Sequence, residues 1–146
     1  MEHGAIGVRK ATWEQDAEAI RRVRTEVFVI EQKVPVELEM DGVDPVCRHV
    51  VAIRATGETV GTARLMDNGQ IGRMAVLKAW RGRGIGSRLV KTLIDSARSD
   101  GRRQVHLHAQ SHAIAFYQKL GFRDIGEPPF DDAGIPHIRM DLEVGE

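Results

Sequence analysis

Apolar residues recur at helical spacing in two long segments of the chain. After an extended stretch that begins at Val8, Thr12 and Gln15 have the spacing of a capping box, which predicts a helix from about Trp13. The buried side of this helix is expected to contain Trp13, Ala17, Ile20, Val23 and Val27. The second helix is the clearest in the chain and ends at Gly101, with apolar positions Ile85, Leu89, Val90, Leu93, Ile94 and Ala97.

Between these helices the pattern indicates strands. Residues 33–45 contain Pro35, Gly42 and Pro45 and are predicted to be a loop with room for one short helical turn. Residues 49–55, 59–65 and 70–76 read as three strands, and Asn68-Gly69 is a strong hairpin signal between the last two. The middle of the chain is therefore predicted to be an antiparallel meander.

In the C-terminal part of the chain, predicted strands and a helix alternate. Residues 105–109 read as a strand, and Ser111 is expected to cap a helix over residues 113–120 that ends at Gly121. Strands are predicted from Phe122 onward and over residues 138–142. This order of elements predicts one α/β (α+β) domain over residues 1–146, with a mixed sheet covered by helices.

The most informative stretch joins the strand over residues 70–76 to the second helix. Its turn reads Arg81-Gly82-Arg83-Gly84-Ile85-Gly86. Alternate glycines let the backbone approach a ligand closely, and the first N–H groups of the helix have no internal acceptor. Arg81, Arg83 and Arg88 add positive charge, so this turn is predicted to bind a phosphate or pyrophosphate.

Two common phosphate motifs do not fit this turn. A P-loop needs Lys followed by Ser or Thr directly after its last glycine, whereas Gly86 is followed by Ser87 and Arg88. A dinucleotide fingerprint needs a third glycine at position 87 and an acidic residue ending the next strand, which ends in Ala109 and Gln110.

Read as Arg-x-x-Gly-x-Gly, the turn resembles the acetyl-CoA signature of the GNAT superfamily, together with the preceding Met74-Ala75-Val76. The segment from Ala113 to Phe122 resembles a later motif of that family, in which a helix carries a tyrosine and ends in Gly-Phe. Residues 27–32 and 134–138 further resemble its ElaA-like bacterial branch. The order of elements extends the resemblance over nearly the whole chain.

The resemblance implies a mostly antiparallel central sheet of about six to seven strands flanked by about four helices. It implies transfer of an acetyl group from acetyl-CoA to a primary amine of a small molecule or peptide, by direct attack in a ternary complex. The CoA contacts it assigns are Met74, Ala75, Val76, Arg81, Gly82, Arg83, Gly84, Ile85, Gly86, Gln110 and Tyr117. Gln110 departs from the Asn that is frequent seven residues before the tyrosine, although Gln also donates and accepts.

Among the catalytic candidates, Tyr117 is expected to act as the general acid, because a phenol can donate to the departing thiolate. The general base stays open among Glu31, His49, His108 and His137, with Glu31 slightly preferred and His108 closest to Tyr117 by topology. A non-catalytic acyl-CoA-binding sensor on the same fold is the alternative function.

No metal site is expected. His106, His108 and His112 lack the spacing of a known zinc site and have no cysteine beside them, and Cys47 has no marked activating partner beyond His49.

Composition narrows the partners. The chain has 21 basic and 21 acidic residues, which argues against a nucleic-acid binder, and one cysteine, no signal segment and no long apolar run, which favour a cytoplasmic protein. Glu31, Glu37, Glu39, Asp41 and Asp44 form the one acidic region. It is read either as a solvated loop or as a border of the acceptor site that favours a cationic amine. The resemblance also allows a homodimer.

Overall fold

The computed structural model describes residues 5–145, so residues 1–4 and 146 of the predicted 1–146 domain lie outside the described residues. None of the described helices is both long enough and apolar enough to cross a membrane. The strands are β1 (Gly7–Ala11), β2 (Arg48–Ile53), β3 (Thr59–Leu65), β4 (Gln70–Val76), β5 (Gln104–Gln110), β6 (Arg123–Asp124), β7 (Phe130–Asp132) and β8 (Ile135–Glu143). The helices are α1 (Trp13–Arg24), α2 (Val36–Glu39), α3 (Ile85–Ser99) and α4 (Ile114–Lys119), with a π-helix η1 (Thr25–Glu31) and short 3₁₀ turns η2 (Asp44–Val46), η3 (Lys78–Trp80) and η4 (Ser111–Ala113).

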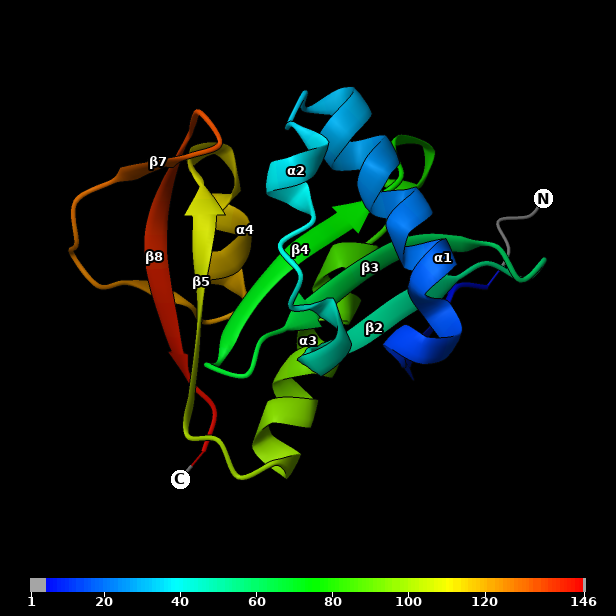
Figure 1. Cartoon of the computed structure of the whole chain (residues 1–146). Coiled ribbons are helices and arrows are strands. Elements are labelled where there is room, and N and C mark those ends of the chain that lie inside the picture. Colours follow the sequence, from blue (N-terminus) through cyan, green and yellow to red (C-terminus); the bar gives the residue numbers. More distant parts are fainter. Residues whose placement is uncertain (1–4, 146) are drawn as a thin grey trace.

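One mixed sheet organises the molecule, in the order β1-β2-β3-β4-β5-β8-β6, with β7 added on β8. Among the strands of residues 5–145, only β4 and β5 pair in parallel. Helices α1 and α2 lie on one face of the sheet, and α3 and α4 lie on the other (Figure 1). The predicted fold class is confirmed, although the sheet has eight strands because the short β6 and β7 join it.

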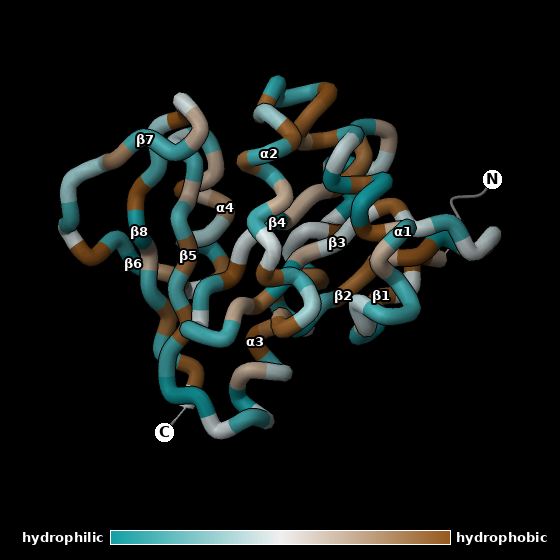
Figure 2. The backbone as a smooth tube through the Cα atoms, viewed as in Figure 1, coloured by the Kyte–Doolittle hydropathy of each residue, from teal (hydrophilic) through white to brown (hydrophobic). Residues whose placement is uncertain are grey.

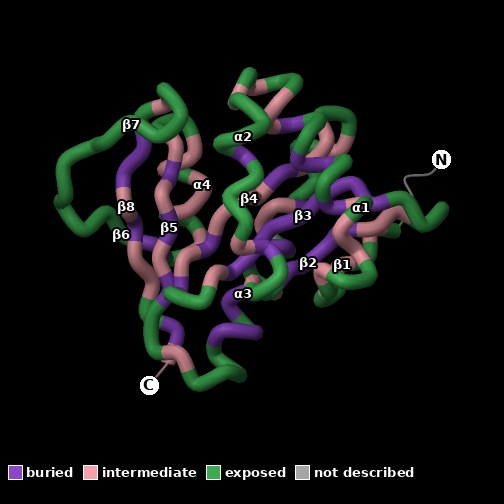
Figure 3. The backbone as a smooth tube through the Cα atoms, in the orientation of Figure 1, coloured by how far each residue is buried: buried purple, intermediate pink, exposed green. Residues whose placement is uncertain are grey.

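The core lies between the sheet and α3. The predicted apolar face of this helix is buried, including Leu89, Val90 and Leu93 at 0% exposure. Burying each such side chain stabilises the fold by about 1.5–3 kcal/mol. The packing is close, since a Cβ on Gly61 of β3 would lie 3.2 Å from Leu89 Cδ1. Figure 2 shows hydrophobic residues recurring along β2 and α3, and Figure 3 shows β2 largely buried and α3 with buried and exposed residues in alternation.

The start of α1 confirms Thr12 as the predicted N-cap, but the residue that accepts from the Thr12 N–H differs from the predicted one. Thr12 Oγ1 accepts the Gln15 N–H at 3.2 Å, as a capping box requires. The reciprocal acceptor for the Thr12 N–H is Asp16 Oδ2, at 3.0 Å, and not Gln15. A carboxylate is the stronger acceptor, and it also favours the positive end of the helix dipole.

Several predicted boundaries are wrong. The first helix does not continue as an α-helix to Val27, because η1 widens into a π-helix after Arg24. Ser111 begins the turn η4 and caps nothing, while the N-cap of α4 is Ala113. Strand β7 was not predicted at all. Each miss is short, and the sequence pattern carries little periodicity over so few residues.

Three carboxylates of the acidic segment, those of Glu39, Asp41 and Asp44, form ion pairs with arginines. Arg24 binds Glu39 at 2.5 Å and Asp44 at 2.7 Å, and Arg64 binds Asp44 at 2.8 Å and Asp41 at 2.5 Å. Arg24, Glu39, Asp44 and Arg64 are 1–5% exposed. The reading as a solvated loop is therefore wrong for the buried Glu39 and Asp44, while the reading as a border of the acceptor site stays a prediction.

These ion pairs lower the pKa values of the carboxyl groups of Asp41 and Asp44. The Arg64 hydrogen bond lowers the pKa of Asp41 to about 2. Burial alone would raise the pKa of Asp44, but hydrogen bonds from Arg24 and Arg64 outweigh it and lower that pKa. A depressed folded-state pKa contributes stability above the unfolded value near 3.8 that is lost as pH falls through the folded value.

Replacing Arg24 tests this network. Arg24→Ala leaves the buried Glu39 with only the longer contact to Arg73, at 3.5 Å, and leaves the buried Asp44 with only Arg64, so we expect the free energy of unfolding to fall by about 3–5 kcal/mol. Urea denaturation measures this loss. The control is Arg54→Ala, which removes an exposed pair with Glu58 and should cost at most about 1 kcal/mol. Equal losses in the two variants would contradict the assignment.

Candidate functional site

Strands β4 and β5 pair over a very short length and then diverge. Their register includes only Gln70 with His106 and Ile71 with Leu107. On its other side β5 stays paired with β8 over seven residue pairs. Figure 1 shows the two strands opening toward their carboxyl ends. The opening leaves the edge of β4 without a partner from Gly72 onward, and this edge is where the sequence motifs converge.

A β-bulge accompanies the divergence. Thr62 and Arg64 of β3 oppose Ala75 and Gly72 of β4, so β4 has one extra residue in this interval. Arg73 lies there with a φ of 49°, in the left-handed region that a side chain rarely adopts. Such strain costs about 1–3 kcal/mol and is frequent at functional sites.

The opening exposes main-chain groups of β4. The Leu77 N–H donates to Val60 of β3 at 2.9 Å. Because successive N–H groups of an extended strand point to opposite edges, the Val76 N–H points toward the opening, as does that of Met74. The Val76 carbonyl is on the same side, where it accepts from Arg81 Nε at 2.9 Å.

The glycine turn provides a second set of main-chain donors. Gly82 and Gly84 both have a φ of 79°, and Gly84 is the N-cap of α3. No side chain caps this helix, so its first N–H groups are left for a ligand. A Cβ at either glycine would meet nothing within 4 Å, which means that the backbone conformation, not the space, requires glycine.

A cavity of about 680 Å³ joins these two sets of donors. It runs from the end of β4 past the glycine turn to the start of α4, and Met74, Val76, Gly84, Gly86 and Phe116 are among its lining residues. Its volume is within the range of small-molecule and cofactor sites. Predicted CoA-binding residues of β4 and of the glycine turn therefore line one continuous space, whereas Arg83, Gln110 and Tyr117 do not line it.

Two predicted site residues bind each other. Glu31, at the end of η1, accepts from Arg81 Nη1 and Nη2 at 2.6 Å each. Hydrogen bonding from Arg81 lowers the pKa of Glu31. Arg81 thus ties the turn to η1 and to Val76. Arg83 lies over the Trp80 ring at 4.7 Å. The positive charges of both arginines are close to the turn, but both terminal nitrogens of the Arg81 guanidinium already donate to Glu31.

A second cavity of about 170 Å³ lies between β4 and β5. It shares Gln32, Met74, His112 and Ala113 with the larger cavity, so the two adjoin. Tyr117, His108, Gln110 and Arg73 line it. The structure thus brings Tyr117, His108 and Gln110 together and places Glu31 outside this group.

Tyr117 packs among apolar groups. Its ring meets Phe116 and Phe122 edge to face, with centroids 5.0 and 5.9 Å apart. Burial raises the pKa of its phenol to about 12. The phenol is therefore fully protonated near neutral pH and is available as a proton donor.

His108 and Gln110 project from β5 toward the opening. His108 Nδ1 lies 3.2 Å from Gln70 Nε2, and its ring meets Phe130 edge to face at 4.9 Å. Burial lowers the pKa of His108, which favours the neutral ring. Gln110 Nε2 donates to Gln32 Oε1 at 3.4 Å and so links β5 to the residue after η1. The other two candidate bases have partners of their own. The His49 ring stacks on Trp13, and His137 Nδ1 lies 2.7 Å from the Ile135 carbonyl oxygen.

Sequence reasoning missed Arg73, Gln32 and Phe28, which also line the smaller cavity. Gln32 and Phe28 lie in the segment that resembles the ElaA-like branch, so that resemblance could have indicated them. Arg73 gave no signal, because neither its left-handed backbone nor its place in a bulge follows from the residue type.

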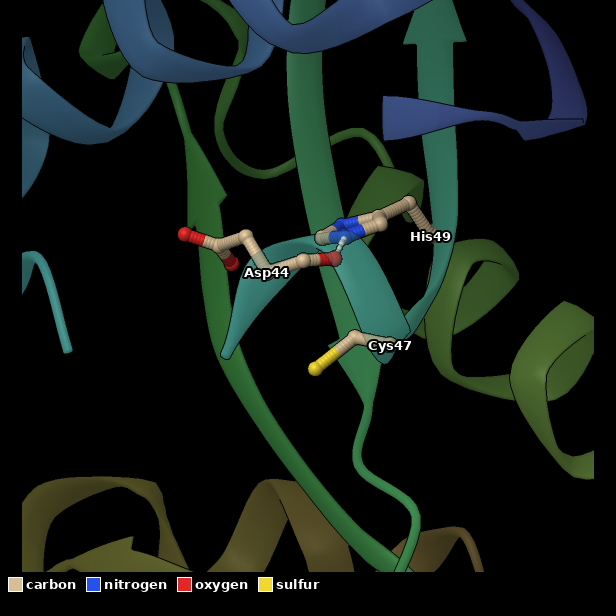
Figure 4. Close-up of side chains that lie close together, drawn as sticks. All are labelled: Asp44, Cys47 and His49. Carbon is tan, nitrogen blue, oxygen red and sulfur yellow. Dashed lines mark hydrogen bonds between the residues drawn. The ribbon is translucent and has the colours of Figure 1, made fainter. Parts of the chain in front are cut away.

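One group of three metal-ligand side chains, Asp44, Cys47 and His49, lies close together within residues 5–145. The Asp44 carboxylate is engaged by Arg24 and Arg64. His49 Nε2 meets the main-chain carbonyl of Asp44 at 2.9 Å, as Figure 4 shows, and burial raises the pKa of the Cys47 thiol. Two arginines on the carboxylate and a protonated thiol make this group a poor cation ligand.

Comparisons with known proteins agree with this geometry. The family model described as an acetyltransferase (GNAT) domain matches residues 16–144. The N-acetyltransferase YjcF of Bacillus subtilis is 40% identical over 120 residues, which cover 81% of this chain and 86% of YjcF. Protein ElaA of Escherichia coli is 36% identical over 135 residues, which cover 86% of each chain.

Solved structures are similar over nearly the whole chain. The crystal structure of an acyl-CoA N-acyltransferase from Pseudomonas aeruginosa has a TM-score of 0.83 and 33% identity, covering 94% of this chain and 99% of that one. The crystal structure of Escherichia coli ElaA has a TM-score of 0.83 and 29% identity, with the same coverage. The predicted resemblance is confirmed.

Gly84→Ala tests the turn as a CoA site. The left-handed backbone costs a side chain about 1–2 kcal/mol, so the turn should rearrange and the Kd for CoA should rise about tenfold. Isothermal titration calorimetry measures it. Gly57→Ala is the control, since Gly57 has a φ of 94° with nothing within 4 Å and lies in the β2–β3 turn. The control should lose similar stability without losing CoA affinity; an unchanged Kd in Gly84→Ala would argue against the site.

Proposed function

Because the chain belongs to the GNAT acetyltransferase family, whose activity is acyl transfer from acyl-CoA, we propose that it transfers an acetyl group from acetyl-CoA to a primary amine. The observation that carries this proposal is the opening between β4 and β5, with main-chain donors on one edge and Tyr117 across it. A ternary complex suits this arrangement, since the two adjoining cavities can hold both reactants at once.

The donor is proposed to lie in the larger cavity. Its pyrophosphate binds the N–H groups of the glycine turn and the start of α3, where the helix dipole favours an anion. Its pantetheine follows the open edge of β4 as an additional strand would, contacting Met74, Ala75 and Val76. Gln110, which lines the smaller cavity together with Met74, is proposed to contribute an amide contact.

The thioester is proposed to stop where the two cavities meet. The Val76 N–H then donates to its carbonyl oxygen, on which negative charge develops as the amine attacks. The C–N bond forms, the C–S bond breaks, and the departing thiolate takes the phenolic proton of Tyr117. The buried phenol carries its proton near neutral pH, as a general acid must before it donates.

For the base, the geometry favours His108 over Glu31. The Glu31 carboxylate is held by two hydrogen bonds from Arg81, and its lowered pKa makes it a weak base. His108 lines the same cavity as Tyr117 and is mostly neutral near pH 7 because burial lowers its pKa. Rotation of the Gln70 amide lets its Oε1 accept from Nδ1–H, which frees Nε2 to take the amine proton, directly or through water.

Tyr117→Phe tests the acid. Loss of the phenolic proton donor should lower kcat by about 100-fold, while the Kd for acetyl-CoA changes little because the ring still packs between Phe116 and Phe122. Release of free CoA thiol with an amine panel measures turnover. An unchanged kcat would remove Tyr117 from the mechanism. CoA binding by the wild-type protein without turnover of any amine would favour the acyl-CoA sensor.

His108→Gln tests the base through pH. Because the pKa of His108 is lowered, its neutral, basic form is lost only at pH values below the ordinary pKa of 6.5. The pH profile of wild-type kcat/KM should therefore show an acidic limb below that pH. The variant should lose this limb and about 100-fold in rate. His106→Gln is the matched control, because His106 is on the same strand outside the cavity, and it should keep the limb. Loss of the limb in Glu31→Gln instead would make Glu31 the base.

A further inference from the structure

Arg73 is a charged residue of the smaller cavity to which no role has been given. Its side chain is 25% exposed and reaches back over the bulge to the end of α2. Nε donates to the Glu39 carbonyl at 3.2 Å, and Nη2 donates to the carbonyls of Leu38 and Glu39 at 3.3 and 3.0 Å. Nη2 also meets Asp41 Oδ2 at 3.3 Å. Nη1 has no acceptor among residues 5–145, so the guanidinium is held in place with one nitrogen free.

The cavity that Arg73 lines has no carboxylate. Its charged or titratable side chains are Arg73, His108, His112 and Tyr117, and the remainder are apolar or amide groups. Asp132 and Glu127 act on His108 only through longer-range electrostatics and do not line the space. The nearby carboxylates of Glu39, Asp41 and Asp44 pair with arginines, including Arg73 itself at 3.5 Å from Glu39 and 3.3 Å from Asp41, and none of the three lines the space. A cationic acceptor would find no counter-charge in this cavity.

We propose that the acceptor is an amine that also carries an anionic group, of which an amino acid is the simplest example, and that Arg73 binds this group. The proposal rests on the proposed acetyl transfer. Arg73 is a specificity-determining residue in this account: it places the anionic group at the bulge so that the amine lies between His108 and the thioester.

The electrostatics of Arg73 agree with an anionic ligand. Burial lowers its pKa and the neighbouring charge of Arg64 lowers it further, and the carboxylates of Asp41 and Glu39 offset these effects only in part. A partly buried cation with an unused donor gains more from an anion than an exposed one does, because solvent screens it less. The volume of about 170 Å³ limits this part of the acceptor to a few heavy atoms.

The first experiment compares matched acceptors that differ in charge. We would measure kcat/KM with acetyl-CoA for glycine against glycinamide, phenylalanine against phenylalaninamide, and phosphoethanolamine against ethanolamine. A charged hydrogen bond to Arg73 should favour the anionic member of a pair by about tenfold or more. The amide has the less basic amine and more of it is neutral, so amine reactivity alone would favour the amide. The phosphate pair tells whether carboxylate or phosphate is preferred.

Variants of Arg73 assign the preference. Arg73→Gln should lower kcat/KM for the anionic member by more than for its neutral partner, so that the ratio within each pair falls, and Arg73→Lys should restore part of this ratio. Both members of a pair are measured on one preparation of the variant, so a loss of active protein through partial unfolding lowers both kcat/KM values equally and leaves their ratio unchanged. A ratio that stays as in the wild type in Arg73→Gln, or a wild-type ratio of one or below in all pairs, overturns the proposal.

A binding measurement separates this proposal from the proposed function. In the presence of CoA, N-acetylglycine should bind the wild-type protein about tenfold more tightly than N-acetylglycinamide, and calorimetry detects this without turnover. If the protein acetylates no amine but keeps this preference, acetyl transfer fails and the anion site stands. If amines are acetylated and the two products bind equally, the anion site fails and acetyl transfer stands.

Discussion

The early end of the β4–β5 pairing is the constraint on which the rest of the site depends. After Ile71 and Leu107 the two parallel strands separate, and the bulge at Arg73 turns β4 away from β5. An unpaired strand edge inside a sheet normally costs stability, because its main-chain groups lose their partners. In this chain the edge opens on a cavity, so a ligand can supply the missing partners.

The buried arginine network and the site are coupled through the same carboxylates. Glu39 and Asp41 bind Arg24 and Arg64 in the core, and they also approach Arg73 at 3.5 and 3.3 Å. Arg73 in turn holds the end of α2 by its carbonyls. The strained backbone at Arg73 is thus stabilised by contacts that also fix the segment after η1. This explains why acidic residues near the site serve packing and leave the smaller cavity without negative charge.

Backbone chemistry made the glycine turn and the helix that follows it predictable from sequence. Gly82, Gly84 and Gly86 indicated a turn, and the apolar spacing from Ile85 to Ala97 indicated the helix behind it; both were found. The acceptor side was not predictable in the same way. The pairing of Glu31 with Arg81, fifty residues apart, and the burial of Glu39 and Asp44 arise from tertiary contacts. A carboxylate looks the same in sequence whether it is solvated, paired or catalytic.

A crystal structure of the protein with acetyl-CoA would test the central claim most directly, namely that the open edge of β4 holds the thioester. The account predicts the thioester oxygen within hydrogen-bond distance, about 2.7–3.2 Å, of the Val76 nitrogen, with the pyrophosphate on the N–H groups of the glycine turn. The Tyr117 hydroxyl should face the sulfur. A thioester bound away from β4, with β4 and β5 closed on each other, would contradict the account.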